Sequence, residues 1–326
     1  MDKHIAIIGA GELGSRHLQG LSKIGRSVNI SIVDPSISSL NKAKKRFQEM
    51  PPSNFIRSIS YVKTLNGLKG PIDLAIISTN ADIRKKVVEK MVEIVSVKYI
   101  ILEKIVFQSV DHFETVLQLF KDNEILAWVN CPKRAYPFFI ELQKLLLGEA
   151  RLYMNVDGGN WGLASNAIHI LDLFAFLTGE SELSIITSGL NNNVYPSKRN
   201  GFLELGGFLK VISKRGDHLI LFDEKNSERP ISLQICSANY KYNIFQSEDR
   251  VLYYQKKNNW KRKEKTFTTP YQSELTHLVA EQILDSGTSK LTTLEESFLL
   301  HRPLISAFND HLMKITGDSY SQCPIT

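Results

Sequence analysis

Short, continuous apolar runs alternate with amphipathic segments through the first 130 residues of the chain. Each run has the length of a strand that is buried on both faces, and the segments between the runs carry apolar residues at helical spacing. The runs lie at residues 5–8, 30–33, 73–77, 99–102 and 125–129. Because strands that alternate with helices form a parallel sheet covered on both faces, we predict a doubly wound α/β domain over residues 1–130.

The pattern changes in the second half, where strand-like runs follow one another with short turns. Such runs favour antiparallel pairing. They lie near residues 153–156, 185, 208–212, 219–222, 232–236, 242–245 and 251–254. Helical spacing predicts helices at about 165–177, 270–284 and 294–314. We therefore predict an α+β domain with an open, largely antiparallel sheet over residues 131–326, whose C-terminal helix can pack back on the first domain.

The first apolar run leads into a glycine-rich turn at residues 9–14, GAGELG, and a helical pattern follows it. Gly9 permits a tight turn, Gly11 lets the backbone approach a pyrophosphate, and Gly14 lets the helix pack close to the strand. The helix N-terminus offers its N–H groups to the phosphates. Asp34, twenty residues after Gly14, ends the second run, where a carboxylate binds ribose hydroxyls and repels a 2′-phosphate. This succession predicts a dinucleotide site that prefers NAD to NADP.

Polar residues also follow the later runs of the first domain. Ser78-Thr79-Asn80, Glu103-Lys104 and Asn130 each stand at the carboxyl end of a predicted strand. Because parallel strands end at one edge of a sheet and ligands bind beyond that edge, we expect these residues to converge on the dinucleotide.

Lys104 is the first candidate for chemistry. A lysine beside a bound nicotinamide can hydrogen-bond a substrate hydroxyl, and partial burial would lower its pKa toward a useful range. The alternative is a surface lysine that ends a strand, but its position at the binding edge favours the chemical role. His17 lies on an apolar helix face and is interpreted as structural.

The second candidate is His169, in the segment WGLASNAIHILD that begins at Trp161. Ser165 or Asn166 is a suitable N-cap, which places His169 in the first turn of a helix or just past it. The helix dipole there favours a neutral imidazole, and Asp172, one turn later, can orient the ring and raise its pKa. The alternative is a structural histidine in the core between the two domains.

Together these motifs resemble the glucose-fructose oxidoreductase/inositol dehydrogenase (Gfo/Idh/MocA) family of NAD(P)-dependent sugar oxidoreductases. The segment GAGELGSRH at residues 9–17 resembles the family's glycine-rich loop, and Ser78-Thr79-Asn80 its "TPN" turn. Glu103-Lys104 is similar to its Glu-Lys-Pro motif. Residues 130–137, NCPKRAYP, resemble its Asn-x-Arg-Arg-aromatic segment, and His169 stands in its His-x-x-Asp pattern. The tail TLEES at residues 293–297 with His301 is also similar.

The resemblance implies a Rossmann domain followed by a domain whose open sheet commonly forms a dimer face. It also implies hydride transfer between a sugar carbon and nicotinamide, with Lys104 polarising the reacting oxygen and His169 acting as acid and base. Arg134 would hold the substrate or the nicotinamide amide. The expected cofactor-binding residues are Gly9, Gly11, Glu12, Leu13, Gly14, Asp34, Ser78, Thr79, Asn80, Glu103 and Lys104. The expected substrate-binding residues are Lys104, Arg134, Trp161, Ser165, Asn166 and His169.

The sequence departs from the family pattern at two positions. Ile105 replaces the proline of Glu-Lys-Pro, a change expected to affect local rigidity more than chemistry. Ser165 stands where the family usually has an aspartate, four residues before the histidine. A carboxylate that would support the lysine or bind a sugar hydroxyl is therefore missing from that position.

Composition limits the classes of function. The chain has 326 residues, 43% of them hydrophobic and 23% charged, with a net charge of +6, as in an ordinary globular protein. The basic residues at 256–257 and 261–263 suit a nucleic-acid patch or a solvated hairpin tip, and a single charge run favours the tip. The three cysteines are unpatterned, which indicates neither disulfides nor a metal site and suits a reducing cytosol. No signal peptide or membrane span is apparent, so we expect a cytoplasmic protein.

The sequence thus predicts an NAD-dependent oxidoreductase acting on a secondary hydroxyl or ketone of a sugar or nucleotide sugar, suited to surface-polysaccharide synthesis. NADP is the less favoured coenzyme, and a homodimer or homotetramer formed through the open sheet is expected. Two alternatives stay open: a cofactor-binding protein without turnover, which Ser165 motivates, and a reductase of a non-sugar carbonyl or imine.

Overall fold

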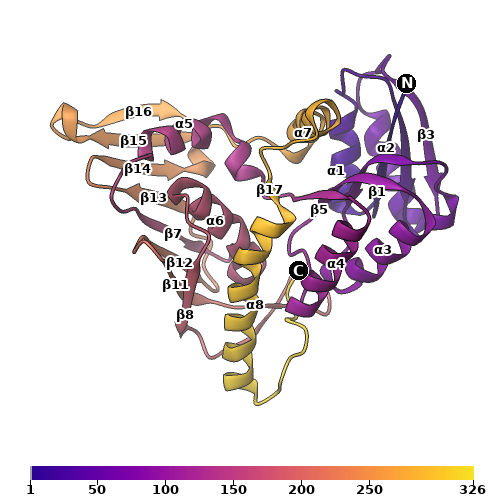
Figure 1. Ribbon diagram of the computed structural model, residues 1–326. Helices are drawn as coiled ribbons and strands as arrows, with labels where there is room; N and C mark the ends of the chain where they lie inside the picture. Colours follow the sequence, from indigo (N-terminus) through magenta and orange to yellow (C-terminus); the bar gives the residue numbers. More distant parts are fainter. Residues whose placement is uncertain (1) are drawn as a thin grey trace. The chain divides into compact units, whose positions relative to one another are not determined.

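The computed structural model describes residues 2–326 and divides them into two compact units (Figure 1). The first unit comprises the residues up to Asn130 together with Pro270–Glu295, and the second comprises Cys131–Thr269 and Glu296–Thr326. The predicted boundary after residue 130 coincides with this division. Residues 270–295, which the sequence analysis placed in the second domain, instead belong to the first unit, because a helix and a strand of this segment pack there.

The first unit contains a sheet of seven strands in the order β17-β6-β5-β4-β1-β2-β3. Six of them are parallel, and only the short strand β17, paired with β6, is antiparallel. The strands are β1 (Lys3–Ile8), β2 (Val28–Val33), β3 (Ile56–Val62), β4 (Ile72–Ile77), β5 (Val97–Leu102), β6 (Leu126–Val129) and β17 (Thr292–Thr293). The central strands are apolar on both faces because helices cover both sides.

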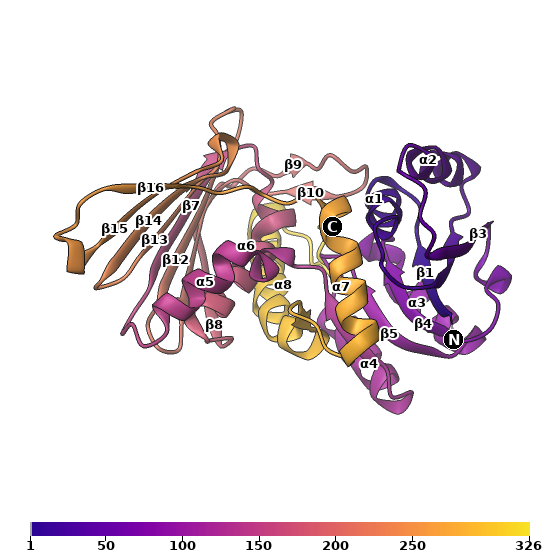
Figure 2. The same cartoon turned by 90° about the horizontal axis from the view of Figure 1, so that it is seen from above.

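Helices α1 and α7 pack together on one face of this sheet, beside α2, and α3 and α4 lie on the other face (Figures 1 and 2). The helices are α1 (Glu12–Leu21), α2 (Ile37–Gln48), α3 (Ala81–Ile94), α4 (Val110–Asp122) and α7 (Gln272–Ser286), and a 3-10 turn covers Leu65–Gly67. Gly20 of α1 lies so close to Thr276 of α7 that a Cβ atom on it would come within 2.7 Å of the threonine Cβ. This close packing explains why residues 270–295 belong to the first unit.

The second unit contains an eight-stranded sheet in the order β16-β15-β14-β13-β7-β12-β11-β8, and its only parallel pair within the described residues is β7 with β12. The strands are β7 (Tyr153–Gly159), β8 (Leu183–Leu190), β11 (Gly207–Ser213), β12 (His218–Glu224), β13 (Ser232–Cys236), β14 (Tyr240–Phe245), β15 (Arg250–Gln255) and β16 (Lys263–Thr266). A separate hairpin joins β9 (Tyr195–Pro196) to β10 (Leu203–Glu204).

Helices cover one face of this second sheet, and its other face is open (Figure 2). The helices of the unit are α5 (Pro137–Leu146), α6 (Leu163–Thr178) and α8 (Leu294–Thr316), with 3-10 turns at Pro132–Ala135, Gln246–Glu248 and Lys256–Asn258. Burial alternates along the strands, so that Leu219 and Leu221 of β12 are buried whereas Ile220 is 41% exposed. Tyr153 and Phe208 are exposed in the same way.

The predicted fold class, a doubly wound parallel sheet followed by an α+β domain with an open, largely antiparallel sheet, is confirmed. The basic run lies at the connection between β15 and β16 with its lysines exposed, as the hairpin-tip interpretation predicts. The predicted start of α6 is wrong. The helix begins at Leu163, after Gly162 at φ 77°, so that His169 stands in its second turn, where the N-terminal dipole acts more weakly.

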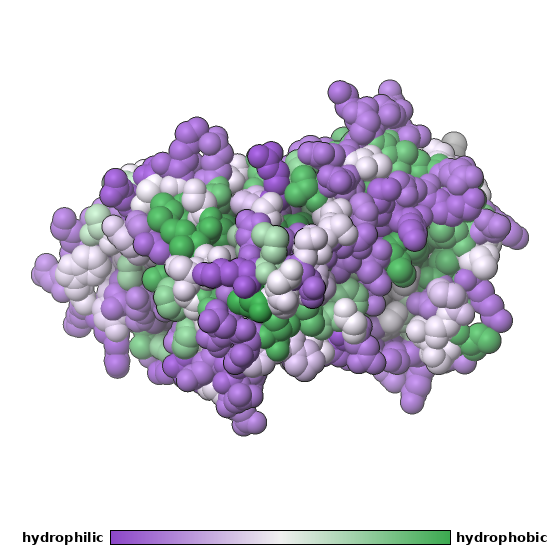
Figure 3. Space-filling view, turned by 90° about the horizontal axis from the view of Figure 1, so that it is seen from below, coloured by the Kyte–Doolittle hydropathy of each residue, from purple (hydrophilic) through white to green (hydrophobic). Residues whose placement is uncertain are grey.

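The described residues contain no helix that is long and apolar enough to span a membrane. On the face drawn in Figure 3, hydrophobic residues lie in small groups among hydrophilic ones.

Candidate active site

The glycine-rich turn between β1 and α1 is shaped by its three glycines. Gly9 has a φ of 96°, and a Cβ atom on it would come within 3.0 Å of the backbone of Ser78 and Thr79. A Cβ atom on Gly14 would lie 1.8 Å from the carbonyl oxygen of Gly9, so only glycine lets the helix start this close to the turn. A Cβ atom on Gly11 would meet nothing within 4 Å. The turn therefore packs tightly on its protein side and is open where a pyrophosphate would approach.

Helix α1 begins directly after this turn without a side-chain N-cap. Glu12 turns toward α2, where its carboxylate accepts hydrogen bonds of 2.6 Å from both Lys42 and Arg46. These two donors lower the pKa of Glu12 to about 2. Leu13 is half-buried. The first N–H groups of α1 thus lack a capping side chain, as an anion site at a helix N-terminus requires.

Asp34 stands at the end of β2, as predicted. Its carboxylate accepts hydrogen bonds from the backbone N–H of Ala10, at 2.7 Å, and of Ser36, at 2.8 Å. The acid therefore also holds the glycine-rich turn, a role that the sequence analysis did not foresee. Each carboxylate oxygen has two lone pairs, so both can still accept a ribose hydroxyl.

The segment after β4 carries hydroxyl groups with unused hydrogen-bonding capacity. Ser78 Oγ and Thr79 Oγ1 are shielded from solvent and have no hydrogen-bond partner among residues 2–326. Asn80 is exposed and precedes α3 without capping it through its side chain. Buried polar atoms are rarely left unpaired, and such atoms beside an open glycine turn fit a bound ligand. On this observation the residues present fit a dinucleotide.

The segment after β5 is held by a buried arginine that the sequence analysis missed. Arg84, 1% exposed, donates hydrogen bonds to the carbonyl groups of Glu103 at 2.6 Å, of Val106 at 2.8 Å, and of Ile105. The same guanidinium donates to the carbonyl of Thr79. Arg84 therefore ties the segment after β4 to the segment that carries Lys104, which is itself half-buried. The peptide bond between Lys104 and Ile105 is cis.

The Glu103 side chain is buried inside the first unit. It is 3% exposed and accepts hydrogen bonds from His17 Nε2, at 2.8 Å, and from Asn130 Nδ2, at 2.6 Å. The geometry therefore does not support a direct contact between this carboxylate and a coenzyme. His17 is structural, as predicted, but its role is polar, since it binds this carboxylate.

In the second unit, carboxylates from distant strands hold the start of α6. Asp223, at the end of β12, accepts hydrogen bonds of 3.0–3.2 Å from the backbone N–H groups of Trp161, Gly162 and Leu163. Lys225 Nζ lies 2.8 Å from the same carboxylate. The loop that leads into the helix is thus fixed by a buried ion pair.

Glu204 of β10 completes this arrangement. One of its oxygens accepts from the N–H of Ala164, at 3.0 Å, and of Ser165, at 3.4 Å, and the other accepts from the Ser165 hydroxyl. A carboxylate therefore does lie at residue 165, although it comes from another strand. The serine at residue 165 in place of an aspartate, noted in the sequence, therefore does not leave the helix start without a carboxylate.

The remaining predicted residues of this region are also engaged. The indole N–H of Trp161 donates to the carbonyl of Phe222 at 2.8 Å, and Asn166 Nδ2 donates to the carbonyl of Trp161 at 2.7 Å. His169 is half-buried and lies one helical turn after Ser165. Trp161 and Asn166 therefore shape the loop in front of His169 with these polar groups.

Arg134 is 7% exposed and faces two carboxylates of its own unit. Its Nε lies 3.0 Å from Asp172, and its terminal nitrogens lie 3.0 and 3.1 Å from Glu296. Burial would lower the pKa of Arg134, but these two carboxylates raise it, so the guanidinium stays charged. Through these two carboxylates Arg134 joins α6 to α8.

Lys133, which the sequence analysis missed, differs from its neighbour. It is half-buried, and burial lowers its pKa to about 8. Among residues 2–326 its ammonium group makes no hydrogen bond or ion pair. In the first unit the candidate residues are the glycine-rich turn, Asp34, residues 78–80 and Lys104. In the second unit they are His169 and the residues around it.

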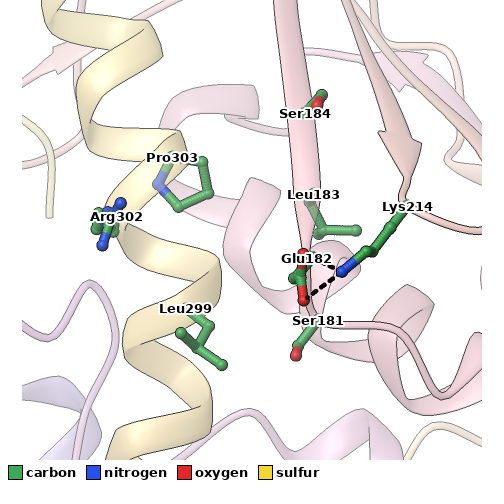
Figure 4. Close-up of a pocket in the computed structure, with 8 residues that line it drawn as sticks. All are labelled: Ser181, Glu182, Leu183, Ser184, Lys214, Leu299, Arg302 and Pro303. Atoms are coloured by element: carbon green, nitrogen blue, oxygen red, sulfur yellow. Dashed lines mark hydrogen bonds and ion pairs between the residues drawn. The ribbon is translucent and has the colours of Figure 1, made fainter.

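A surface cleft of about 410 Å³ in the second unit is lined by residues 181–184, Lys214, Leu299, Arg302 and Pro303 (Figure 4). Its Glu182 and Lys214 pair with each other at 3.0 Å, and none of the predicted site residues lines it. Within the described residues, no cluster of histidine, cysteine and carboxylate side chains could hold a metal ion.

Comparison with known proteins finds a family model that matches the N-terminal part of the chain. Residues 3–131 match the model of a family described as "Oxidoreductase family, NAD-binding Rossmann fold", Gfo/Idh/MocA. No curated protein sequence matches the chain.

Several solved structures have a similar fold over nearly the whole chain. A super-repressor mutant of Gal80p from Saccharomyces cerevisiae has a TM-score of 0.73 and 12% identity, with 96% of this chain and 97% of that chain covered. An oxidoreductase from Agrobacterium radiobacter in complex with NAD+, L-tartaric acid and magnesium has a TM-score of 0.70 and 14% identity, with 98% of both chains covered. The UDP-N-acetylglucosamine 3-dehydrogenase GnnA from Acidithiobacillus ferrooxidans has a TM-score of 0.68 and 12% identity, with 94% and 97% covered.

At these identities the likeness to solved structures is one of fold. The match over residues 3–131 agrees with the glycine-rich turn, the acid after β2 and the parallel sheet described above. The resemblance stated from the sequence is therefore confirmed for residues 3–131, which match the NAD-binding Rossmann-fold model of the Gfo/Idh/MocA oxidoreductase family.

Proposed function

We propose that the protein is an NAD-dependent oxidoreductase that transfers a hydride between nicotinamide and a secondary hydroxyl or ketone of a sugar or nucleotide sugar, a reaction suited to surface-polysaccharide synthesis. The observation that carries this proposal is the binding edge of the first unit. There lie the open glycine turn, the uncapped N-terminus of α1, and the hydroxyls of Ser78 and Thr79, which have no partner among residues 2–326. The segment that carries Lys104 follows β5 at the same edge of the sheet.

Two side chains are assigned to the reacting oxygen. When bound, NAD accepts or supplies the hydride. Lys104 donates a hydrogen bond to the oxygen on the reacting carbon and stabilises the negative charge that develops there. His169 takes the proton from this oxygen during oxidation and returns it during reduction. The proposal requires both side chains to reach the same substrate.

A substrate panel tests the proposal. NADH or NAD absorbance at 340 nm is followed with free sugars, nucleotide sugars, and simple ketones and imines, for the wild type and for Lys104→Ala and His169→Asn. We expect turnover with a sugar or nucleotide sugar that falls by at least about 100-fold in either variant, as for loss of a general acid or base. Exchange of the exposed Lys290 for alanine is the matched control and should change nothing.

The second candidate function is a cofactor-binding protein without turnover. Ser165 in place of the family's aspartate motivates it, and one of the proteins of similar fold is a mutant of the repressor Gal80p. This candidate predicts NADH binding, seen as enhanced coenzyme fluorescence, with no substrate-dependent absorbance change in the whole panel. Turnover with a ketone or imine but no sugar would favour the third hypothesis, a reductase of non-sugar carbonyls.

Asp34 is proposed to select NAD over NADP. Asp34→Asn keeps one of the two oxygens that accept from the N–H groups of Ala10 and Ser36, and it removes the charge that repels a 2′-phosphate. We expect NADH affinity to fall about tenfold and NADPH affinity to stay level or rise, a relative shift near 1.4 kcal/mol. An unchanged ratio of the two affinities would show that Asp34 does not select the coenzyme.

We also propose that the open face of the second sheet joins two copies of the chain into a homodimer or homotetramer. Tyr153, Phe208, Ile186 and Ile220 project from neighbouring strands of that face with exposed fractions of 39–52%. Phe208→Asp should convert the oligomer to monomers in light scattering, whereas the same change at the exposed Leu147 of the α5 end should not. A monomeric wild type would refute this part of the proposal.

A further inference from the structure

A buried polar ring lies inside the first unit next to Lys104. Its centre is Glu103, whose carboxylate oxygen Oε1 accepts hydrogen bonds from His17 of α1 and Asn130 at the end of β6. His17 Nδ1 lies 3.0 Å from Thr276 Oγ1 of α7. Asn130 Nδ2 donates to Gln272 Oε1 at 2.9 Å, and Gln272 Nε2 donates to Thr276 Oγ1 at 3.1 Å. The five side chains therefore close a ring, called here the Glu103 ring.

The Glu103 ring holds a negative charge in the protein interior. Burial would raise the pKa of this carboxyl group, but the hydrogen bond and charge of His17, the amide of Asn130 and the charge of Arg84 lower it to about 2. Apolar side chains of the same volume would usually stabilise an interior as well or better. The charge therefore indicates a task other than stability.

The neighbours of Lys104 are fixed on both sides. Before it, the side chain of Glu103 is bound in the ring, and after it, the carbonyl groups of Ile105 and Val106 accept hydrogen bonds from Arg84. Glu103, Ile105 and Val106 are at most 3% exposed, whereas Lys104 between them is half-buried. The Lys104 side chain therefore projects from a segment that cannot shift without breaking buried hydrogen bonds.

The ring also links Lys104 to the coenzyme loop. His17 stands on α1, the helix that starts at the glycine-rich turn, and its ring bonds directly to the residue before Lys104. A shift of either segment relative to the other would break the bond between His17 and Glu103. The separation between the phosphate-binding turn and the lysine is therefore set by a buried pair 2.8 Å apart.

We propose that Glu103 is a positioning residue for Lys104, and that the Glu103 ring and Arg84 together fix the lysine relative to the coenzyme loop. This inference rests on the proposed function, in which Lys104 binds the reacting oxygen. It assigns a task to His17, Gln272 and Thr276, all of which lie outside the glycine-rich turn in the sequence. Holding a reactive group in place is worth a large part of an enzyme's rate.

The first test compares Glu103→Gln with Glu228→Gln, an exposed glutamate, as the control. The amide introduced by Glu103→Gln keeps an oxygen acceptor for His17 and nearly the same shape, but removes the charge. With a substrate found in the panel, we expect kcat to fall about tenfold or more while the KM for NADH changes less than about threefold, because a positioning loss acts on the transition state. Wild-type kcat in a folded Glu103→Gln protein would overturn the proposal.

The second test needs no substrate, so it separates failure of this inference from failure of the proposed function. Lysine acetylation is followed residue by residue by mass spectrometry, with the exposed Lys290 as internal standard. We expect Lys104 to react about threefold faster or more in Glu103→Gln, since the segment loosens and a neighbouring negative charge is lost. An unchanged Lys104 rate would overturn the inference even if the enzyme is active.

A third comparison guards against misfolding of the glutamate variant. His17→Gln keeps a donor for Glu103, whereas His17→Ala removes it. Positioning predicts that Lys104 reactivity in His17→Gln stays within about twofold of the wild type, while His17→Ala reproduces the faster reaction of Glu103→Gln. Equal Lys104 rates in both His17 variants would contradict the role of this bond.

Discussion

Polar groups are hydrogen-bonded differently in two regions of the molecule, the binding edge of the first unit and the start of α6 in the second unit. At the first, Gly11 faces open space and the hydroxyls of Ser78 and Thr79 have no partner among residues 2–326. At the second, each backbone N–H group from residue 161 to 165 donates to the carboxylate of Asp223 or Glu204. The first is built to be completed by a ligand, and the second is completed by the protein.

This difference shows what orders the polar groups in each unit. Unsatisfied polar groups cost folding free energy and are kept where a ligand will pair them. A helix start held by two carboxylates is ordered without any ligand, so His169 is presented on a rigid element. Changes at the first site should therefore trade stability against coenzyme binding, and changes at the second should cost stability directly.

The largest effect is expected at the glycines of the turn. Gly14→Ala would place a methyl group 1.8 Å from the carbonyl oxygen of Gly9, and the backbone must move. We expect a loss of about 3 kcal/mol or more of unfolding free energy, as for overpacking without room to relax. Gly11→Ala should leave stability within about 0.5 kcal/mol, yet weaken NADH at least about tenfold, since its methyl group enters the ligand space.

Urea unfolding and NADH fluorescence of both variants measure this pair of effects. If Gly11→Ala bound NADH like the wild type, the open side of the turn would not be the phosphate site.

The next effect concerns the pair formed by Ser165 and Glu204. Ser165→Asp places a second carboxylate against Glu204, and Glu204→Gln removes a charge from the helix start, so each change alone should cost about 1–2 kcal/mol. In the double variant Ser165→Asp/Glu204→Gln the charge moves to residue 165 and the new amide can donate to it. We expect the double variant to lose about 2 kcal/mol less unfolding free energy than the sum of the losses in the two single variants.

A double-mutant cycle from urea unfolding measures that coupling. Additive costs would mean that Glu204 does not act at residue 165. If the swap also keeps substrate turnover where Glu204→Gln loses it, the carboxylate, whichever strand supplies it, serves the reaction.

Residues in local sequence motifs could be predicted, whereas residues whose partners are distant in the sequence could not. The glycine-rich turn, Asp34 and Lys104 could be located because each follows a strand end in a local pattern of a few residues. Glu204 and Arg84 could not, because nothing in the local sequence marks them. The partners of Glu204 lie 39 and 40 residues away, and those of Arg84, apart from Thr79, lie 19–22 residues away. The strand pairs of the second sheet were predictable from alternation, but the hairpin that carries Glu204 has strands of only two residues.

A smaller effect is expected from the partnerless hydroxyl of Thr79. Thr79→Val keeps the shape and removes a buried oxygen that has no partner within residues 2–326. Without coenzyme the variant should gain about 1 kcal/mol of stability, and its NADH affinity should fall about fivefold, since the ligand loses a hydrogen bond. Thr276→Val, at a hydroxyl that is bonded to Gln272 and His17, is the matched control and should lose stability. A loss of stability in Thr79→Val would contradict the comparison.

The smallest effect concerns the reactivity of Lys133, whose neighbour Arg134 is paired with carboxylates of the second unit. Burial lowers the pKa of Lys133 to about 8, whereas the ordinary value for a lysine in water is about 10.4. Acetylation requires the free amine, so the Lys133 rate should rise through pH 8 and level off above about pH 9. The exposed Lys198 is the reference for the rate. At pH 8 we expect Lys133 to react about tenfold faster than Lys198, provided that the reagent reaches it, and NADH should leave the rate unchanged. Parallel pH profiles for the two lysines would show that Lys133 is an ordinary surface lysine, and the polar groups that await a ligand would then be those of the first unit.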